Sequence, residues 1–134
     1  MPKDPSGRDY PDFHAHLDAL EAAGLLTVID APVNKDTEMH PLVRWQFRGG
    51  IPEADRKAFK FTNVTDSKGR KYDMPVVIGA LSTNTEMYSI GMGVPVDEIG
   101  AKWNDAIANP INPVTVEDAP CQEVVIIGDD LVGE

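Results

Sequence analysis

A proline-rich segment near the C-terminus places the strongest constraint on how this chain can fold. The segment NPINPVTVEDAP, residues 109–120, carries prolines at positions 110, 113 and 120. Proline lacks the backbone N–H that the interior of a helix or a central strand requires. We therefore expect an extended connector that separates the chain before it from the short stretch after it.

Apolar spacing before the connector predicts alternating helices and strands. Phe13, Leu17 and Leu20, for example, recur at helical spacing. The first expected elements are a helix over 10–23 capped by Asp9 and a strand over 25–30. A second helix is expected after a cap at Asp36 or Thr37; it ends at Gly49-Gly50, and its apolar face carries Met39, Leu42, Val43 and Phe47. Strands over 59–64 and 74–81 follow, then a helix from Thr83 or Asn84 to Ile90 and a helix over 96–109. The pattern indicates an α/β fold in which helices pack on a short sheet.

Two further features of this part of the chain are assigned ordinary structural roles. The basic stretch from Arg56 to Lys71, which includes DSKGRK, is typical of a solvated hairpin loop. Trp45 and Trp103 are expected to pack in the core. The domain organisation predicted is a flexible tail over 1–10, an α/β domain over 11–109, and the connector with one further strand over 110–134.

The C-terminal stretch reads as a strand without a partner. Residues 124–127, VVII, form a β-branched run of the kind that fills a sheet, but little of the chain remains after the GDD turn to pair with it. The strand is therefore expected to belong to a second structural unit.

Charge and hydropathy exclude two classes of partner. Residues 81–134 hold one basic side chain, Lys102, against ten carboxylates, which would repel a phosphate backbone, so nucleic acid is rejected as the main partner. No apolar stretch approaches the ~20 residues that span a bilayer, and the N-terminal MPKDPSGRDYP has no signal-peptide core. We expect a cytoplasmic protein that does not bind membranes.

The residues that could carry chemistry do not form a recognisable site. His14 and His16, at i and i+2 of a helix, would point apart and could not chelate a metal, and His40 has no partner at ligand spacing. Cys121 is interpreted as a small apolar residue. Ser82 and Ser89 have no histidine near them in sequence.

Two short motifs resemble known ones without meeting their requirements. GMGVPV, residues 91–96, lacks the last glycine of a dinucleotide fingerprint and comes after a helix instead of a strand. The GDD of IIGDDL is similar to the metal-holding hairpin of polymerases, but such an enzyme does not fit in this length. A simple turn at Gly128-Asp129 is expected.

Four stretches resemble the UbiD family of decarboxylases. NPINPVTVEDAPCQEVVIIGDDL is similar to the family's P-x-x-P-V-x-V run leading into P-C-Q-E-V-V and a G-D-D turn. DFHAHLDALEAAGLLTVIDAPVNKDTEMHPLV resembles its opening helix, strand and helix, and FKFTNV with MPVVIGAL resembles its next strand pair. The resemblance covers about residues 11–131.

The resemblance implies the N-terminal domain of an enzyme that decarboxylates aromatic or α,β-unsaturated carboxylic acids. That family uses prenylated FMN with a divalent metal, manganese or magnesium, with potassium as a further candidate, and forms homo-oligomers. Residues 124–127 would then be the first strand of the split β-barrel that binds the flavin. The expected partners are this barrel and a C-terminal domain.

The resemblance assigns no catalytic, cofactor-binding or metal-binding residue to this chain. The family's catalytic carboxylate and arginine residues and its metal ligands lie C-terminal to this segment, so the chain alone is expected to be inactive and to bind no cofactor. The alternative is a free-standing acidic interaction module, or small subunit, that adds its strand at 124–127 to a partner's sheet.

Overall fold

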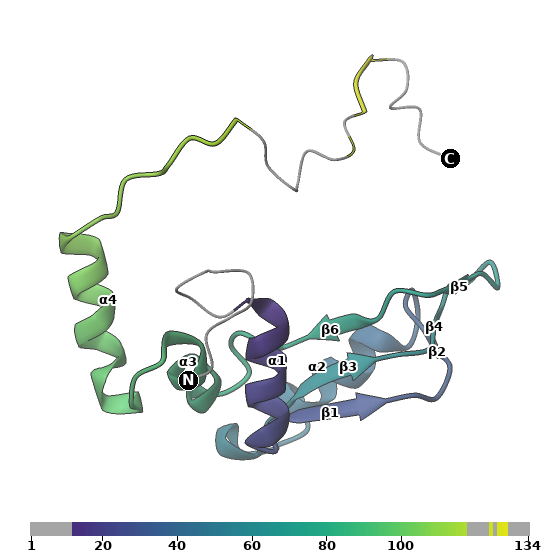
Figure 1. The fold of residues 1–134 in the computed structure, drawn as a ribbon. Coiled ribbons are helices and arrows are strands. Elements are labelled where there is room, and N and C mark those ends of the chain that lie inside the picture. Colours follow the sequence, from purple (N-terminus) through teal and green to yellow (C-terminus); the bar gives the residue numbers. More distant parts are fainter. Residues whose placement is uncertain (1–11, 118–123, 125, 129–134) are drawn as a thin grey trace.

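The structure is a computed structural model that describes residues 12–117, 124 and 126–128. Figure 1 shows the helices and strands along the chain. The helices are α1 (Phe13–Ala22), α2 (Met39–Arg48), α3 (Thr85–Met92) and α4 (Ile99–Ala108), with short 3-10 helices η1 (Glu53–Asp55) and η2 (Val96–Glu98). The strands are β1 (Leu26–Ile29), β2 (Val33–Asn34), β3 (Ala58–Phe61), β4 (Val64–Thr65), β5 (Lys71–Tyr72) and β6 (Val76–Ile78).

The strands form two small mixed sheets. In the first, β3 is central, parallel to β1 and antiparallel to β6. In the second, β4 is central, parallel to β2 and antiparallel to β5. The parallel pair of β1 and β3 requires a crossover connection, which contains α2. The predicted α/β class is confirmed, and so is the predicted pairing of the strands now identified as β3 and β6.

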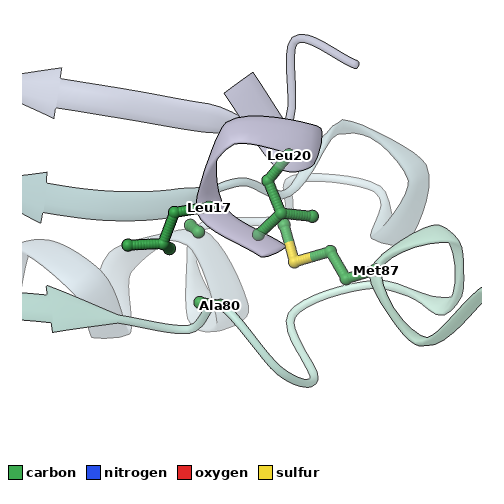
Figure 2. Close-up of a cluster of buried hydrophobic side chains, with 5 residues drawn as sticks. Leu17, Leu20, Ala80 and Met87 are labelled. Atoms are coloured by element: carbon green, nitrogen blue, oxygen red, sulfur yellow. The ribbon is translucent and has the colours of Figure 1, made fainter. Parts of the chain in front are cut away.

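The core divides into two clusters that share strand β3. The first contains Leu17 and Leu20 of α1, Ala58 of β3, Met87 of α3, and Ala80. Figure 2 shows the Leu20 and Met87 side chains directed toward each other. The second joins α2 to both sheets and contains Val33, Met39, Val43, Phe61 and Val64. Ala58 belongs to the first cluster and Phe61 to the second, so β3 couples them.

The starts of the first two helices differ from the sequence prediction. Helix α1 begins after Asp12, whose carboxylate accepts the backbone N–H of Ala15 at 2.9 Å; Asp9 lies outside the described residues. Helix α2 begins after Glu38, which makes no side-chain cap bond. The proposed cap Asp36 instead accepts a hydrogen bond from the backbone N–H of Ser67. A local sequence pattern does not reveal this competing, distant donor.

The strands are shorter and more numerous than predicted. Strand β6 ends at Ile78 because Gly79 has φ 82°, and a Cβ there would overlap the Thr83 hydroxyl that donates to the Gly79 carbonyl. The two-residue strands β2, β4 and β5 were not predicted, because so short a pairing leaves no periodic pattern. The loop between β4 and β5 is the expected hairpin, with residues 67–70 exposed. The earlier part of the basic stretch predicted as a loop is instead strand β3, where Ala58 and Phe61 are buried.

The apolar faces of α2 and α4 are not placed as predicted. Trp45 and Trp103 are 69% and 61% exposed, so the prediction that both pack in the core is wrong. In α2 the residues facing the core are Met39, Val43 and Gln46, while Leu42 and Phe47 are 40% and 46% exposed. Helix α3, by contrast, begins as predicted at Asn84, whose side chain accepts the N–H of Met87.

After α4 the chain leaves the body of the domain. Residues 110–117, which we call the arm, have no regular secondary structure and run clear of the domain in Figure 1. Val124, Ile126 and Ile127 are exposed and outside any strand; Val125 lies outside the described residues. The first strand of a barrel therefore stays a prediction, as do the domain boundaries at 10 and 109.

Within the described residues, no helix is long and apolar enough to cross a membrane.

Candidate functional site

Helix α4 presents an apolar surface to solvent. Trp103 and Ile107 lie one turn apart, 61% and 67% exposed, and Ile99 precedes them by one turn. These three residues form what we call the α4 stripe. Apart from Ile99, every residue of the helix is exposed. Figure 1 shows α4 at the edge of the domain, joined to it through α3 and η2. Large apolar side chains gathered in this way mark an interaction surface.

The arm continues the exposed apolar surface beyond the helix. Ile111 is 96% exposed, Val114 85% and Val116 60%. Singly exposed apolar residues are common in folded proteins, but here three of them follow the α4 stripe within nine residues of Ile107. The described part of the chain therefore ends in an unpartnered apolar region.

A second exposed surface lies between α2 and the first sheet. A groove of about 570 Å³ is lined there by side chains from α2, β1, β3 and the connection between α2 and β3. We call it the α2 groove; its lining residues are Thr27, Pro41, Leu42, Trp45, Gln46, Ile51, Asp55, Lys57 and Phe59. Most of this lining is apolar, with one cation and one carboxylate.

Gln46 fixes the floor of the α2 groove. Its side-chain amide donates to the Lys57 carbonyl and accepts from the Lys57 N–H, each at 2.9 Å. The amide thus satisfies both backbone groups of the residue that leads into β3. With Gln46 turned inward, Trp45 is directed outward at the rim. The sequence interpretation missed this surface. The helical spacing of Met39, Val43 and Gln46 could have indicated that these residues form the buried face of α2.

The hairpin between β4 and β5 is held by the buried carboxylate of Asp66. This carboxylate accepts from the backbone N–H groups of Lys68 and Arg70 at 2.9 Å and from the Tyr72 hydroxyl at 2.8 Å. The Arg70 guanidinium adds an ion pair at 3.1 Å. These donors, the Arg70 N–H most of all, hold the pKa of the Asp66 carboxyl well below its usual range although burial opposes them. Because every partner belongs to the same hairpin, the network stabilises the loop.

Asp66 gives a pH-dependent prediction. Its lowered pKa in the folded state contributes stability that is present above the ordinary aspartate pKa of about 4 and is lost as the pH falls toward the folded pKa. We expect the free energy of unfolding, measured by urea denaturation, to fall less between about pH 7 and pH 3 in Asp66→Asn than in the wild type. Asp73→Asn, at an exposed aspartate nearby, is the control. Equal pH slopes in wild type and Asp66→Asn would contradict this assignment.

The histidines and serines considered from the sequence are not brought together. His14 and His40 are exposed, and the His16 Nε2–H donates to the Ala80 carbonyl at 2.8 Å. The Ser89 hydroxyl donates to the Val94 carbonyl at 2.7 Å. Both groups thus have main-chain partners within the fold. Cys121 and Asp129 lie outside the described residues.

The GMGVPV motif has a simple structural role. Gly91 lies inside α3, and Gly93 ends the helix in the left-handed conformation with φ 65°. The helix break predicted at this point is confirmed, slightly later than expected. The stretch has no strand before it, so it lacks the geometry of a dinucleotide fingerprint.

The described residues do not fit a flavin or a metal ion. No three His, Cys, Asp or Glu side chains among them are gathered as metal ligands. The α2 groove, with Lys57 as its one basic lining residue, is open and mostly apolar, which suits an apolar segment better than a phosphate. We derive no catalytic step through either group.

The comparisons with known proteins point to one family. A family model described as "3-octaprenyl-4-hydroxybenzoate carboxy-lyase N-terminal domain" (UbiD_N) matches residues 17–107, which is more than half of the chain. The match runs from α1 into α4 and so covers both sheets. No solved structure matches the chain.

Proposed function

Because the chain belongs to the UbiD family of carboxy-lyases through its N-terminal domain, we propose that it serves as the N-terminal domain of a decarboxylase. The complete enzyme acts on an aromatic or α,β-unsaturated carboxylic acid with prenylated FMN and a divalent metal, manganese or magnesium. It is a cytoplasmic homo-oligomer. Its catalytic residues lie outside this chain, which is not catalytic by itself.

The α4 stripe is the observation that carries this proposal. Trp103 and Ile107 are exposed at the end of the α/β domain, directly before the arm leads away from it. Burying such residues against a partner contributes about 25 cal/mol per Å² of apolar surface. The proposed partner is the flavin-binding barrel of the same enzyme, and the domain's role is to pack against that barrel.

This proposal predicts the effect of placing charges on the stripe. In the protein continued through its reading frame, Trp103→Asp with Ile107→Asp should lower flavin occupancy and decarboxylation at least about tenfold, because interface anchors of this kind contribute about 2 kcal/mol or more each. The measurements are flavin absorbance per protein and CO2 release. The isolated 134-residue chain should keep its circular dichroism spectrum, since both side chains are exposed.

A control on the same helix separates the stripe from a general effect of added charge. Ala101→Asp introduces the same residue at an exposed position about 200° around the axis from Trp103. It should leave flavin occupancy unchanged. Equal losses from both changes, or none from either, would count against packing through the stripe.

The second candidate is an interaction module that pairs residues 124–127 with a partner's sheet. Val124, Ile126 and Ile127 are exposed, which such pairing requires. A partner captured through this stretch and encoded by a separate gene would favour it. The family match favours the carboxy-lyase domain.

A further inference from the structure

We infer that the α2 groove of one chain receives the arm of a second copy of the same chain. The inference concerns contact between copies and does not depend on the proposed reaction. It begins from the groove, where Trp45 is 69% exposed above a mostly apolar lining. An exposed tryptophan beside a preformed apolar groove is typical of a protein interface.

The arm has the chemistry that such a groove recognises. Pro110 and Pro113 are three residues apart, which is one turn of a polyproline II helix, so in that conformation both rings lie on the same side. Ile111 and Val114 have the same spacing and are 96% and 85% exposed. Aromatic-lined grooves bind P-x-x-P segments because an extended proline segment loses little entropy on binding.

The distribution of charge favours a dimer in which the arm of one chain binds the α2 groove of the other over a dimer in which the two grooves face each other. Arg44 and Arg48 are exposed on α2, and Lys57 lines the groove. Of the described residues, only the pairs Lys35–Asp36 and Arg70–Asp66 form salt bridges, so these three cations have no such partner there. The chain from residue 110 onward carries six acidic side chains and no basic one, and one of the six, Glu117, lies in the arm. Two α2 surfaces that each carry these three cations would repel each other, whereas such a surface attracts the acidic C-terminal stretch to which the arm belongs.

The occupant is a second copy because the chain's own arm does not cover its groove. Figure 1 shows the arm leaving α4 and running clear of the domain, and its apolar residues are exposed. Each chain has one arm and one groove. Reciprocal exchange therefore closes a two-fold symmetric dimer with two identical contacts and no unfilled site.

Sedimentation of the 134-residue chain over a concentration series tests the inference. We expect a monomer–dimer equilibrium in the wild type. Trp45→Ala, the groove variant, and Ile111→Ser with Val114→Ser, the arm variant, should each raise the dimer dissociation constant at least about tenfold. All three side chains are exposed, so both variants should keep the wild-type circular dichroism spectrum. Met74→Ala, at a side chain 76% exposed and outside both surfaces, should leave dimerisation unchanged.

Mixing the two variants gives a sharper test. A pair formed by one groove variant and one arm variant keeps one complete contact, the intact arm of the first in the intact groove of the second. The equimolar mixture should therefore contain heterodimers at concentrations where each variant alone is monomeric. A wild type that stays monomeric throughout would overturn the inference. So would variants that dimerise like wild type, or a mixture without recovery.

Discussion

Replacing Phe61 with alanine is expected to lower the free energy of unfolding by about 3–5 kcal/mol. Phe61 is fully buried, at 0% exposure, and is packed among Val33, Met39, Val43 and Val64. The alanine variant loses the transfer free energy of the ring and leaves a cavity between α2 and the two sheets. Denaturant unfolding followed by circular dichroism measures the change.

A matched truncation outside the core serves as the control. Phe13→Ala makes the same chemical change at a side chain that is 49% exposed at the start of α1. Its effect should be clearly smaller, because much of that ring already contacts water. If the two truncations cost the same, Phe61 would not be the centre of the second cluster.

The second large effect is expected from Leu20→Ala, which should lower the free energy of unfolding by about 2–5 kcal/mol. Leu20 is 0% exposed, and its side chain meets Met87 of α3 (Figure 2). The truncation leaves a cavity in the first cluster, between α1 and α3. Leu81→Ala, at a leucine 66% exposed, is the matched control and should have little effect.

Both core variants should unfold in a single transition. Ala58 and Phe61, from opposite ends of β3, belong to different clusters, so loss of either cluster loosens the same strand. Two-state unfolding is usual for domains of this size. Separate transitions, seen by tryptophan fluorescence and by circular dichroism, would show instead that the clusters fold independently.

Much of the fold was predictable because its signals are local. The cap of α3 depends on Asn84 and on a backbone N–H three residues later, so the sequence is sufficient to place it. The apolar runs that became β3 and β6 are also visible in the sequence, and they pair as predicted. The shared side of Phe59 and Phe61, whose rings lie 6.1 Å apart, is a consequence of strand alternation.

Other features depend on contacts between distant residues. In α2, Leu42 and Phe47 lie about 140° apart, on either side of the face that carries Met39 and Val43. The bonds between Gln46 and Lys57 accompany burial of that central face and leave both flanks exposed. Trp45, next to Gln46 in the helix, then lies on the exposed side and lines the α2 groove, which the sequence pattern alone does not specify. The helical spacing of the apolar residues in α4 was predicted. That spacing does not specify which partner covers the apolar side of the helix.

Carbon dioxide release is the measurement that tests the central claim most directly. The isolated 134-residue chain and the protein continued in frame past Glu134 should each be assayed with aromatic and α,β-unsaturated acids, with prenylated FMN and manganese supplied. We expect no enzymatic release from the chain alone and clear release from the continued protein. Enzymatic release by the isolated chain would contradict its assignment as a non-catalytic N-terminal domain.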